Sequence, residues 1–495
     1  MRNGGFCMGG DLIITGGVPL NGTVRIPAAK NSVLPLLAAS LLCSGTVRLL
    51  AVPQLADVDT SLVLLRGAGC AARWQGSDIT VQSMPSVCRL EPEAAAQMRA
   101  SILFCAPLLA RLGRVETVLP GGCRIGARPI DLHLSGLARM GAHCREEGTR
   151  LILTAPAGLH GADITLGFPS VGATETLLLA AVCAQGETVL RGAAREPEIG
   201  DLAAFLNRCG GCVQGAGTGT VRVQGRRMLY GCSFAPMADR IVASTLACAC
   251  AAAGGRVELT GCAPAVYAPL LEILAQMGCG IETGPESAVI VRSGALHGAG
   301  RVFTGVYPAL ATDAAPLLAA AMLCADSVSS IEDVVFERRF ACADGFAAFG
   351  ADVQVQQRTL HIRPVRQLQG AEAAAPDLRG GAALVIAALA ARGRSRIADT
   401  GHIDRGYACF VQMLTELGAQ IEREMPCGST CEKKHLQKSK FDLHSGQKDD
   451  TIQLYKCKQD TFCAFRALLD KIRWRTKLWH SCSMKKWTKT LRRSR

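Results

Sequence analysis

The stretch LRGAGC (65–70) contains a large apolar residue, three further positions, a glycine and a small residue. The same pattern occurs five more times, as LARMGA (137–142), LNRCGG (206–211), LAQMGC (274–279), FAAFGA (346–351) and LTELGA (414–419). Successive glycines of the pattern are 68–72 residues apart. Because a chance motif would not keep so regular a spacing, the pattern indicates an internal repeat with six copies.

Each repeat contains two helical runs of different character and several short strands. An amphipathic run such as DVDTSLVLLRGAG (57–69) predicts a helix that an Asp or Thr caps and that a left-handed glycine terminates. Alternating segments such as GTVRVQG (219–225) and ADVQVQQ (351–357) predict strands. A second run is apolar on nearly every face, which predicts a buried helix. The six buried runs are 32–45, 100–113, 173–186, 240–255, 313–326 and 381–393. We therefore expect an α/β (α+β) fold.

The first residues of the six buried helices point to a binding site for anions. They are Lys30 and Asn31, Arg99, the run Ser170-Val171-Gly172, Arg240, Asp313 and Arg379. Similar units in similar packing would bring these starts to common regions, and helix N-termini carry free N–H groups with a positive dipole end. Cations at four of the six starts predict a pocket for phosphates and carboxylates. The alternative is that charged residues only keep the helix ends solvated.

The net charge of +13 is concentrated at one end of the chain. Residues 425–495 contain 18 Lys and Arg against 6 Asp and Glu, which leaves a net charge of +1 on residues 1–424. This tail fits a solvated appendage, a basic segment that binds nucleic acid or membrane, or an aberrant extension. Its Cys427, Cys431 and His435 are spaced like zinc ligands, but they have no evident fourth partner, so no metal is expected.

The 23 cysteines and the apolar segments bear on the cellular compartment. No apolar run at the N-terminus is long enough for a signal peptide, and none elsewhere reaches about 18 residues without a break. We therefore expect a cytoplasmic protein with reduced thiols. Cys123 differs from the others because glycines and arginines surround it, and both features favour an accessible, reactive thiol.

Several motifs resemble those of the enolpyruvyl transferases over residues 10–424. They include AAKNSVLPLLAASLL, DVDT, PGGCRIGARPIDLH, SVGAT, AAREPEIGD, VFERRF and HIDRGY, in the family's order. The resemblance implies two inverse α/β barrels of three repeats each, with an active site in the cleft between them. The implied domains are 1–29 with 238–424, which carries Asp313 and Arg405, and an inserted domain 30–237 with the Cys123 loop. The tail 425–495 lies outside this fold.

The cysteine loop resembles the family members that transfer the enolpyruvyl group of phosphoenolpyruvate to the 3-hydroxyl of UDP-N-acetylglucosamine, releasing phosphate for peptidoglycan synthesis. The resemblance implies small-molecule substrates and no cofactor. Implied catalytic residues are Cys123, Asp313, Lys30 and Arg405. Implied phosphoenolpyruvate contacts are Lys30, Asn31, Arg128, Arg379 and Arg405. Implied nucleotide-sugar contacts are Arg99, Arg128, Pro129, Ile130, Asp131, Leu132, Ser170, Val171, Gly172, Asp313 and Val335.

Cys123 is expected to act in proton delivery or product release and to form a covalent adduct, as in family members that fosfomycin alkylates. Asp313 would act as the base for the sugar hydroxyl, although an Asp at TDAAP could equally be a helix cap. Two positions depart from the family pattern. Phe168 stands where a lysine is frequent, and IVAST follows Asp239-Arg240 where a Glu-Thr pair is usual. The loss of that lysine would remove one cation from the diphosphate site.

Two other functions stay open at the level of sequence. Phe168 is a small argument for an enolpyruvyl transferase with another phosphorylated acceptor, such as a phosphorylated cyclitol. A non-enzymatic repeat scaffold with a basic binding tail would not need Cys123, Asp313, Lys30 and Arg405 together.

Overall fold

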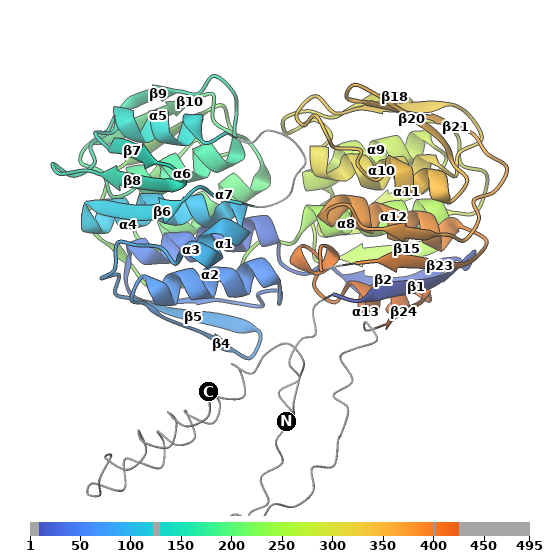
Figure 1. The fold of residues 1–495 in the computed structure, drawn as a ribbon, viewed down its shortest axis with the longest axis horizontal. Helices are drawn as coiled ribbons and strands as arrows, with labels where there is room; N and C mark the ends of the chain where they lie inside the picture. The colour runs from blue at the N-terminus through green and yellow to red at the C-terminus, as the bar shows by residue number, and fades with distance from the viewer. Residues whose placement is uncertain (1–8, 122–128, 400, 425–495) are drawn as a thin grey trace, which may run out of the picture. The chain divides into compact units, whose positions relative to one another are not determined.

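The strands pair into six small sheets, five of them mixed, in the computed structural model, which describes residues 9–121, 129–399 and 401–424 (Figure 1). In hydrogen-bonded order, three sheets of residues 43–234 are β13 (Leu229–Tyr230), β3 (Cys43–Leu49), β5 (Asp78–Ser83) and β4 (Ala71–Gln75), with β14 (Ser233–Phe234) also on β3; β6 (Arg114–Val118), β8 (Arg150–Thr154) and β7 (His143–Glu147); and β9 (Asp163–Thr165), β10 (Glu187–Arg191), β12 (Thr220–Gln224) and β11 (Val213–Gln214). Two further sheets include the first strands of the chain: β22 (Glu372–Ala374), β23 (Gly393–Ala398), β1 (Asp11–Gly16) and β24 (Gln420–Glu424); and β2 (Leu20–Arg25), β15 (Gly255–Thr260), β17 (Ser287–Arg292) and β16 (Gly280–Thr283). The sixth sheet is β18 (Gly300–Phe303), β19 (Ser329–Glu332), β21 (Thr359–Arg363) and β20 (Asp352–Gln356).

The sheets share one pairing order. In five of them, within the described residues, a parallel pair of strands is followed by two antiparallel pairs; β18 and β19, for example, are parallel, and β21 then pairs antiparallel with β19 and β20. The sheet of β6, β8 and β7 is antiparallel, and a parallel bridge from Arg89 to Glu116 of β6 occupies the place of the missing edge strand. The predicted strands at 219–225 and 351–357 are confirmed as β12 and β20.

The predicted left-handed glycines end the amphipathic helices. These helices are α2 (Ala56–Gly67), α5 (Asp131–Arg139), α7 (Pro197–Arg208), α9 (Ala268–Gln276), α11 (Ala343–Ala348) and α13 (Phe410–Glu416). The six motif glycines have φ values between 80° and 101°. In each motif the small residue donates its N–H to the carbonyl of the leading apolar residue, as Cys70 does to Leu65 at 3.0 Å. The repeated pattern is therefore a helix-ending Schellman motif, which needs a residue without a Cβ at its left-handed position.

The predicted Asp or Thr caps at the other ends of these helices are wrong, because none of the six helices has a side-chain capping bond at its N-terminus. α2 begins after Leu55, which makes no side-chain capping bond, and Asp57 lies inside the first turn. α7 begins with Pro197 after Glu196, which also makes no such bond. Proline is favoured at the first helical position, because its missing N–H would have no partner there and its fixed φ suits the helix. The carboxylates near both helix starts are directed to other partners, described below.

The second set of helices is buried, as predicted. Its members are α1 (Lys30–Ala39) with η1 (Ser40–Leu42), η2 (Arg99–Phe104) continuing into α4 (Cys105–Leu112), α6 (Val171–Ala181), α8 (Arg240–Ala253), η4 (Thr312–Ala314) continuing into α10 (Ala315–Met322), and α12 (Leu378–Ala390). α8, α10 and α12 pack against one another, and α6 packs against both α4 and η2. The remaining helices are α3 (Pro92–Gln97), η3 (Pro264–Tyr267) and η5 (Ile403–Arg405).

The buried apolar side chains form two hydrophobic clusters. One contains residues between 33 and 229, and the other contains residues 12–26 together with residues between 241 and 419. β1 pairs with β23 and β24, which come last among the described strands, and β2 pairs with β15 from the middle of the sequence (Figure 1). Within the described residues, no helix is both long and apolar enough to cross a membrane.

Candidate active site

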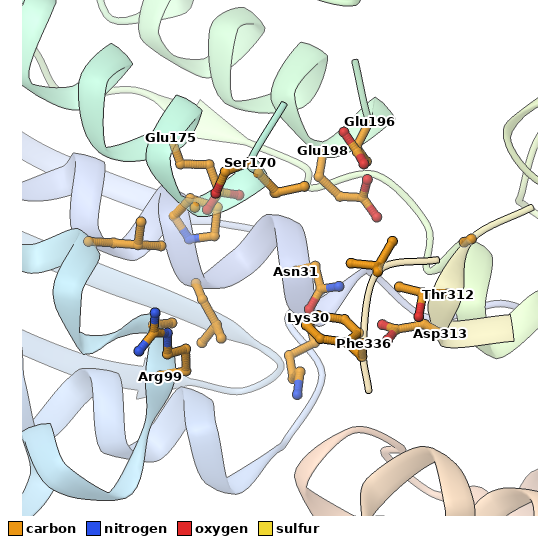
Figure 2. A pocket seen from close by; sticks show the side chains of 18 of the residues that line it. Lys30, Asn31, Arg99, Ser170, Glu175, Glu196, Glu198, Thr312, Asp313 and Phe336 are labelled. Atoms are coloured by element: carbon orange, nitrogen blue, oxygen red, sulfur yellow. The ribbon is translucent and has the colours of Figure 1, made fainter. Parts of the chain in front are cut away.

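The first residues of the buried helices meet at one pocket of about 590 Å³. Its lining includes every helix start singled out from the sequence, namely Lys30, Asn31, Arg99, Ser170, Val171, Gly172, Arg240, Asp313 and Arg379. The expectation that similar units would direct these residues to a common region is confirmed. Figure 2 shows Lys30 and Asn31 with Glu196 and Glu198 on one side of them and Thr312 and Asp313 on another.

Asp57 holds two of the pocket's cations. Its Oδ2 lies 3.3 Å from the Nζ of Lys30, and its Oδ1 accepts a hydrogen bond from the Nε of Arg405 at 3.0 Å. Arg405 lies on η5 and also donates to the carbonyl of Gln97 at 3.3 Å. The buried carboxylate thus fixes a lysine and an arginine from segments 375 residues apart in the sequence, with both cations at the pocket wall.

Asp313 is an ionised carboxylate held between two arginines. It lies in η4, where it forms an ion pair with Arg339, and its Oδ2 lies 3.4 Å from Nη2 of Arg379. Burial acts to raise the pKa of Asp313, but the two guanidinium groups outweigh burial and hold that pKa well below its usual range. Its side chain makes no capping bond to the helix backbone, so the alternative that this residue is only a helix cap is wrong.

Arg379 is a buried arginine that lines the pocket. It is 4% exposed, and its Nη1 has no hydrogen-bond partner among the described residues. Its guanidinium lies over the ring of Tyr407 at 5.1 Å, and the Tyr407 hydroxyl is 2.8 Å from the Thr245 hydroxyl. The side chain of Asp377 caps the helix by accepting from the backbone N–H of Arg379 at 2.9 Å. A buried guanidinium with a free donor is well suited to bind an anionic ligand.

Three glutamates form an acidic wall on another side of the pocket. Glu175 lies in α6, Glu196 precedes α7, and Glu198 lies in its first turn, where its Oε1 pairs with Nε of Arg240 at 3.0 Å. Burial, together with Glu198 and Glu196, raises the pKa of Glu175 well above its usual value. Burial likewise raises the pKa of Glu196. Arg240 forms an ion pair with Glu198, whereas burial and the two neighbouring carboxyl groups favour the protonated form of Glu175.

Most of the remaining predicted contacts also line the pocket. Pro129, Asp131, Leu132 and Val335 are among the lining residues, whereas Ile130 is not. Ser170 caps α6 by accepting a hydrogen bond from the Ala173 N–H at 3.3 Å, so the α6 N-terminus opens on the pocket.

Comparison with known proteins agrees with this arrangement. A protein-family profile of EPSP synthase (3-phosphoshikimate 1-carboxyvinyltransferase) matches residues 14–414. The UDP-N-acetylglucosamine 1-carboxyvinyltransferase of Nitratidesulfovibrio vulgaris (strain Hildenborough) is 43% identical over 419 residues, covering 83% of this chain and 99% of that protein. The chain belongs to the enolpyruvyl transferase family. The protein of the same name from Lawsonia intracellularis is 41% identical over 414 residues, again covering 83% of this chain and 99% of the relative.

Solved structures place the fold in the same family. The enolpyruvyl transferase NikO from Streptomyces tendae superposes with a TM-score of 0.75 at 26% identity, covering 84% of this chain and 99% of that one. EPSP synthase from Acinetobacter baumannii superposes with a TM-score of 0.65 at 18% identity, covering 84% and 100% of the two chains. The second comparison shows a shared fold only.

Two of the residues expected from the enolpyruvyl transferase motifs lie outside the described residues. These are Cys123 and Arg128, which fall in the segment 122–128; Cys427, Cys431 and His435 of the tail are also outside. Gly121, just before this segment, allows a close approach of the backbone, because a Cβ there would lie 1.7 Å from the carbonyl oxygen of Ala96. Among the described residues, no group of three or more His, Cys, Asp and Glu is arranged to hold a metal ion.

Sequence reasoning gave no role to several residues that shape the enolpyruvyl transferase pocket. Asp57, Glu196 and Glu198 stand at the starts of amphipathic helices, and a search of those starts as well as the buried ones could have found them. Glu175 and Arg339 carry no such signal. Glu175 follows the SVG run by one turn of an apolar helix, and Arg339 lies in an irregular segment, so only tertiary packing brings either to the pocket.

Proposed function

We propose that the chain transfers the enolpyruvyl group of phosphoenolpyruvate to the 3-hydroxyl of UDP-N-acetylglucosamine and releases inorganic phosphate, an early step of peptidoglycan synthesis in the cytoplasm. The observation that carries the proposal is the meeting of six helix starts, with their cations and one paired carboxylate, at a single pocket. The relatives named for this reaction are 40–43% identical over almost their whole length, whereas NikO is 26% identical. This difference favours the nucleotide sugar over another acceptor.

The two substrates would bind to different parts of the pocket. Lys30, Asn31, Arg379 and Arg405 would hold the carboxylate and phosphate of phosphoenolpyruvate, and the free Nη1 of Arg379 supports this assignment. The N-terminus of α6 and Arg99 would hold the diphosphate of the nucleotide sugar, since helix N-termini bind phosphate well. Pro129, Asp131, Leu132 and Val335 would complete the nucleotide-sugar site. Ile130 would contribute only through its backbone or after rearrangement, because it does not line this pocket.

The reaction requires one proton to leave the sugar hydroxyl and one to reach the methylene carbon of phosphoenolpyruvate. The hydroxyl oxygen bonds to the central carbon while the terminal carbon gains a proton; loss of a proton from that carbon then re-forms the double bond as phosphate leaves. Asp313 would accept the hydroxyl proton. Arg339 and Arg379 make it a weak base without substrate. An anion bound to Arg379 would partly neutralise that guanidinium and so raise the basicity of Asp313.

Residues Cys123 and Arg128, just before Pro129, would complete the site. We assign to Cys123 a role in proton delivery or product release and in covalent adduct formation, and to Arg128 a contact with substrate phosphate. We further propose that the six sheets with their helices are six copies of one unit in two inverse α/β barrels. The domains would be 1–29 with 238–424, and 30–237. The shared pairing order of the sheets and the two hydrophobic clusters support this division.

The test is release of phosphate from phosphoenolpyruvate by the full chain in the presence of UDP-N-acetylglucosamine. We expect release that depends on the nucleotide sugar and that falls strongly for Cys123→Ser and Asp313→Asn. Fosfomycin should inactivate the protein but not Cys123→Ser. A truncation after Glu424 would show whether the tail is needed. Release that requires shikimate 3-phosphate or a phosphorylated cyclitol would assign another acceptor, and a folded protein with no release at all would overturn the enzyme proposal.

A further inference from the structure

Two thiols touch at the end of α7 that lies away from the pocket. The Sγ of Cys209, the residue that follows α7, is 3.4 Å from the Sγ of Cys232, and 23 residues separate the two in sequence. Cys209 is buried, and Cys232 is partly exposed. A third thiol, Cys43 at the start of β3, lies close enough to Cys209 to act on its ionisation. The transfer reaction uses none of these three residues.

The backbone holds the two cysteines in register. Tyr230 donates its N–H to the carbonyl of Cys209 at 2.8 Å, and Arg48 of β3 donates to the carbonyl of Cys232 at 2.8 Å. The segment with Cys232 is also fixed by β13 and β14, which pair with β3 on either side of it. The sulfur atoms need to approach by only about 1.4 Å to reach the length of a disulfide bond. The fold therefore keeps the two free thiols close without a disulfide bond between them.

We propose that Cys209 and Cys232 are a disulfide-forming pair, which a small-molecule disulfide oxidises by thiol exchange. The Cys232 thiolate attacks the small disulfide, forms a mixed disulfide and expels one small thiolate. The Cys209 sulfur then attacks the Cys232 sulfur and expels the second small thiolate. Each cysteine loses its thiol proton, so two protein thiols and one small disulfide give one protein disulfide and two small thiols.

Exposure and charge favour Cys232 as the first of the two to react. It is the more exposed member, and Arg208 beside it favours the thiolate, although burial and the Cys209 thiol raise the pKa of Cys232 to about 12. The neighbouring Cys43 thiol and burial raise the pKa of Cys209 further. Because the attacking species is the thiolate, oxidation should be slow at neutral pH and accelerate as pH rises. A metal site is disfavoured, since the described residues contain no suitable group of three ligands.

The test is peptide mapping of the full chain after equilibration with reduced and oxidised glutathione at pH 7 and pH 9. After alkylation, tryptic cleavage gives the segment 209–222, which holds Cys209 and Cys212, and the segment 228–240, which holds Cys232. We expect these two segments to appear joined, with the loss of two hydrogen atoms, and to form faster at pH 9. The joined pair should raise the midpoint of thermal unfolding, because a cross-link restricts the unfolded chain.

Matched variants separate this pair from its neighbours. Cys212→Ser removes the other thiol of segment 209–222 and should leave the joined product unchanged, whereas Cys209→Ala and Cys232→Ser should each abolish it. Cys43→Ala should also leave it unchanged. The proposal is overturned if both cysteines remain alkylatable in oxidised glutathione at pH 9, if Cys43 is found joined to Cys209 instead, or if the product persists in Cys232→Ser. Because the readout is a covalent link, it is independent of whether the chain transfers enolpyruvyl groups.

Discussion

Asp57 and Arg405, which are 348 residues apart in the sequence, form a 3.0 Å hydrogen bond at the wall of the pocket. The same carboxylate lies 3.3 Å from the Nζ of Lys30. Three charges from three segments thus set each other's positions before any substrate binds. A cation fixed in place loses less entropy when it captures an anion, so a residue that need not touch substrate can contribute to its binding.

The first prediction concerns this carboxylate. Asp57→Asn should lower kcat/KM for phosphoenolpyruvate by about 10–100-fold, because Lys30 and Arg405 lose the charge that orients them. Steady-state kinetics of phosphate release measures the effect. Asp59→Asn is the matched control, since Asp59 lies on the same helix but is exposed and accepts a hydrogen bond from Trp74. Equal losses in the two variants would show that Asp57 supports only the helix.

The second prediction concerns the base. Arg339→Gln removes the closer of the two guanidinium groups that lower the pKa of Asp313, so that pKa should rise. Protonation of Asp313 would then cut off kcat/KM at a higher pH than in the parent protein. In the parent protein, the lowered pKa of Asp313 stabilises the fold at pH values above the unfolded-state pKa, and this contribution is lost as pH falls. Arg339→Gln should reduce this contribution to the free energy of unfolding. The pH profile of kcat/KM checks this, and an unmoved acid limb would remove Asp313 from the role of base.

The third prediction concerns the glycine that defines the repeat. Gly350 has φ +80° and open space around its Cα, so Gly350→Ala should lower the free energy of unfolding by about 1–2 kcal/mol through backbone strain alone. Gly200 lies inside α7, its φ is not positive, and a Cβ added there would meet no atom outside its own helix within 4 Å, so Gly200→Ala should instead raise stability by about 0.5–1 kcal/mol. Urea unfolding compares the two, and equal effects would refute the conformational argument.

The repeat was readable from the sequence because helix termination is local. An apolar residue, a glycine and a small residue at fixed spacing satisfy a Schellman motif wherever they occur, and all six did so. The starts of the buried helices are equally predictable from the sequence, and their first residues line the pocket. Local sequence patterns do not predict which residue pairs with each charged side chain. The sequence predicts Asp57 only as part of a capped helix, yet Asp57 binds Lys30 and Arg405, because its partners depend on which segments the sheets bring together.

Glu175 supplies the last prediction. It is 5% exposed, and burial together with Glu198 and Glu196 raises its pKa well above the usual value. In the unfolded chain this carboxyl ionises near pH 4.5. Above that pH the folded protein therefore retains a proton that the unfolded chain has lost. The stability of the parent protein should therefore fall as pH rises from there towards the raised pKa. Glu175→Gln keeps a neutral group of the same shape without this cost, so its thermal midpoint should exceed that of the parent by a margin that widens between pH 5 and pH 8. Glu146→Gln, at an exposed position, should show no widening margin. If the two variants behave alike, Glu175 is ionised in the folded protein and the acidic wall carries more negative charge than its single arginine balances.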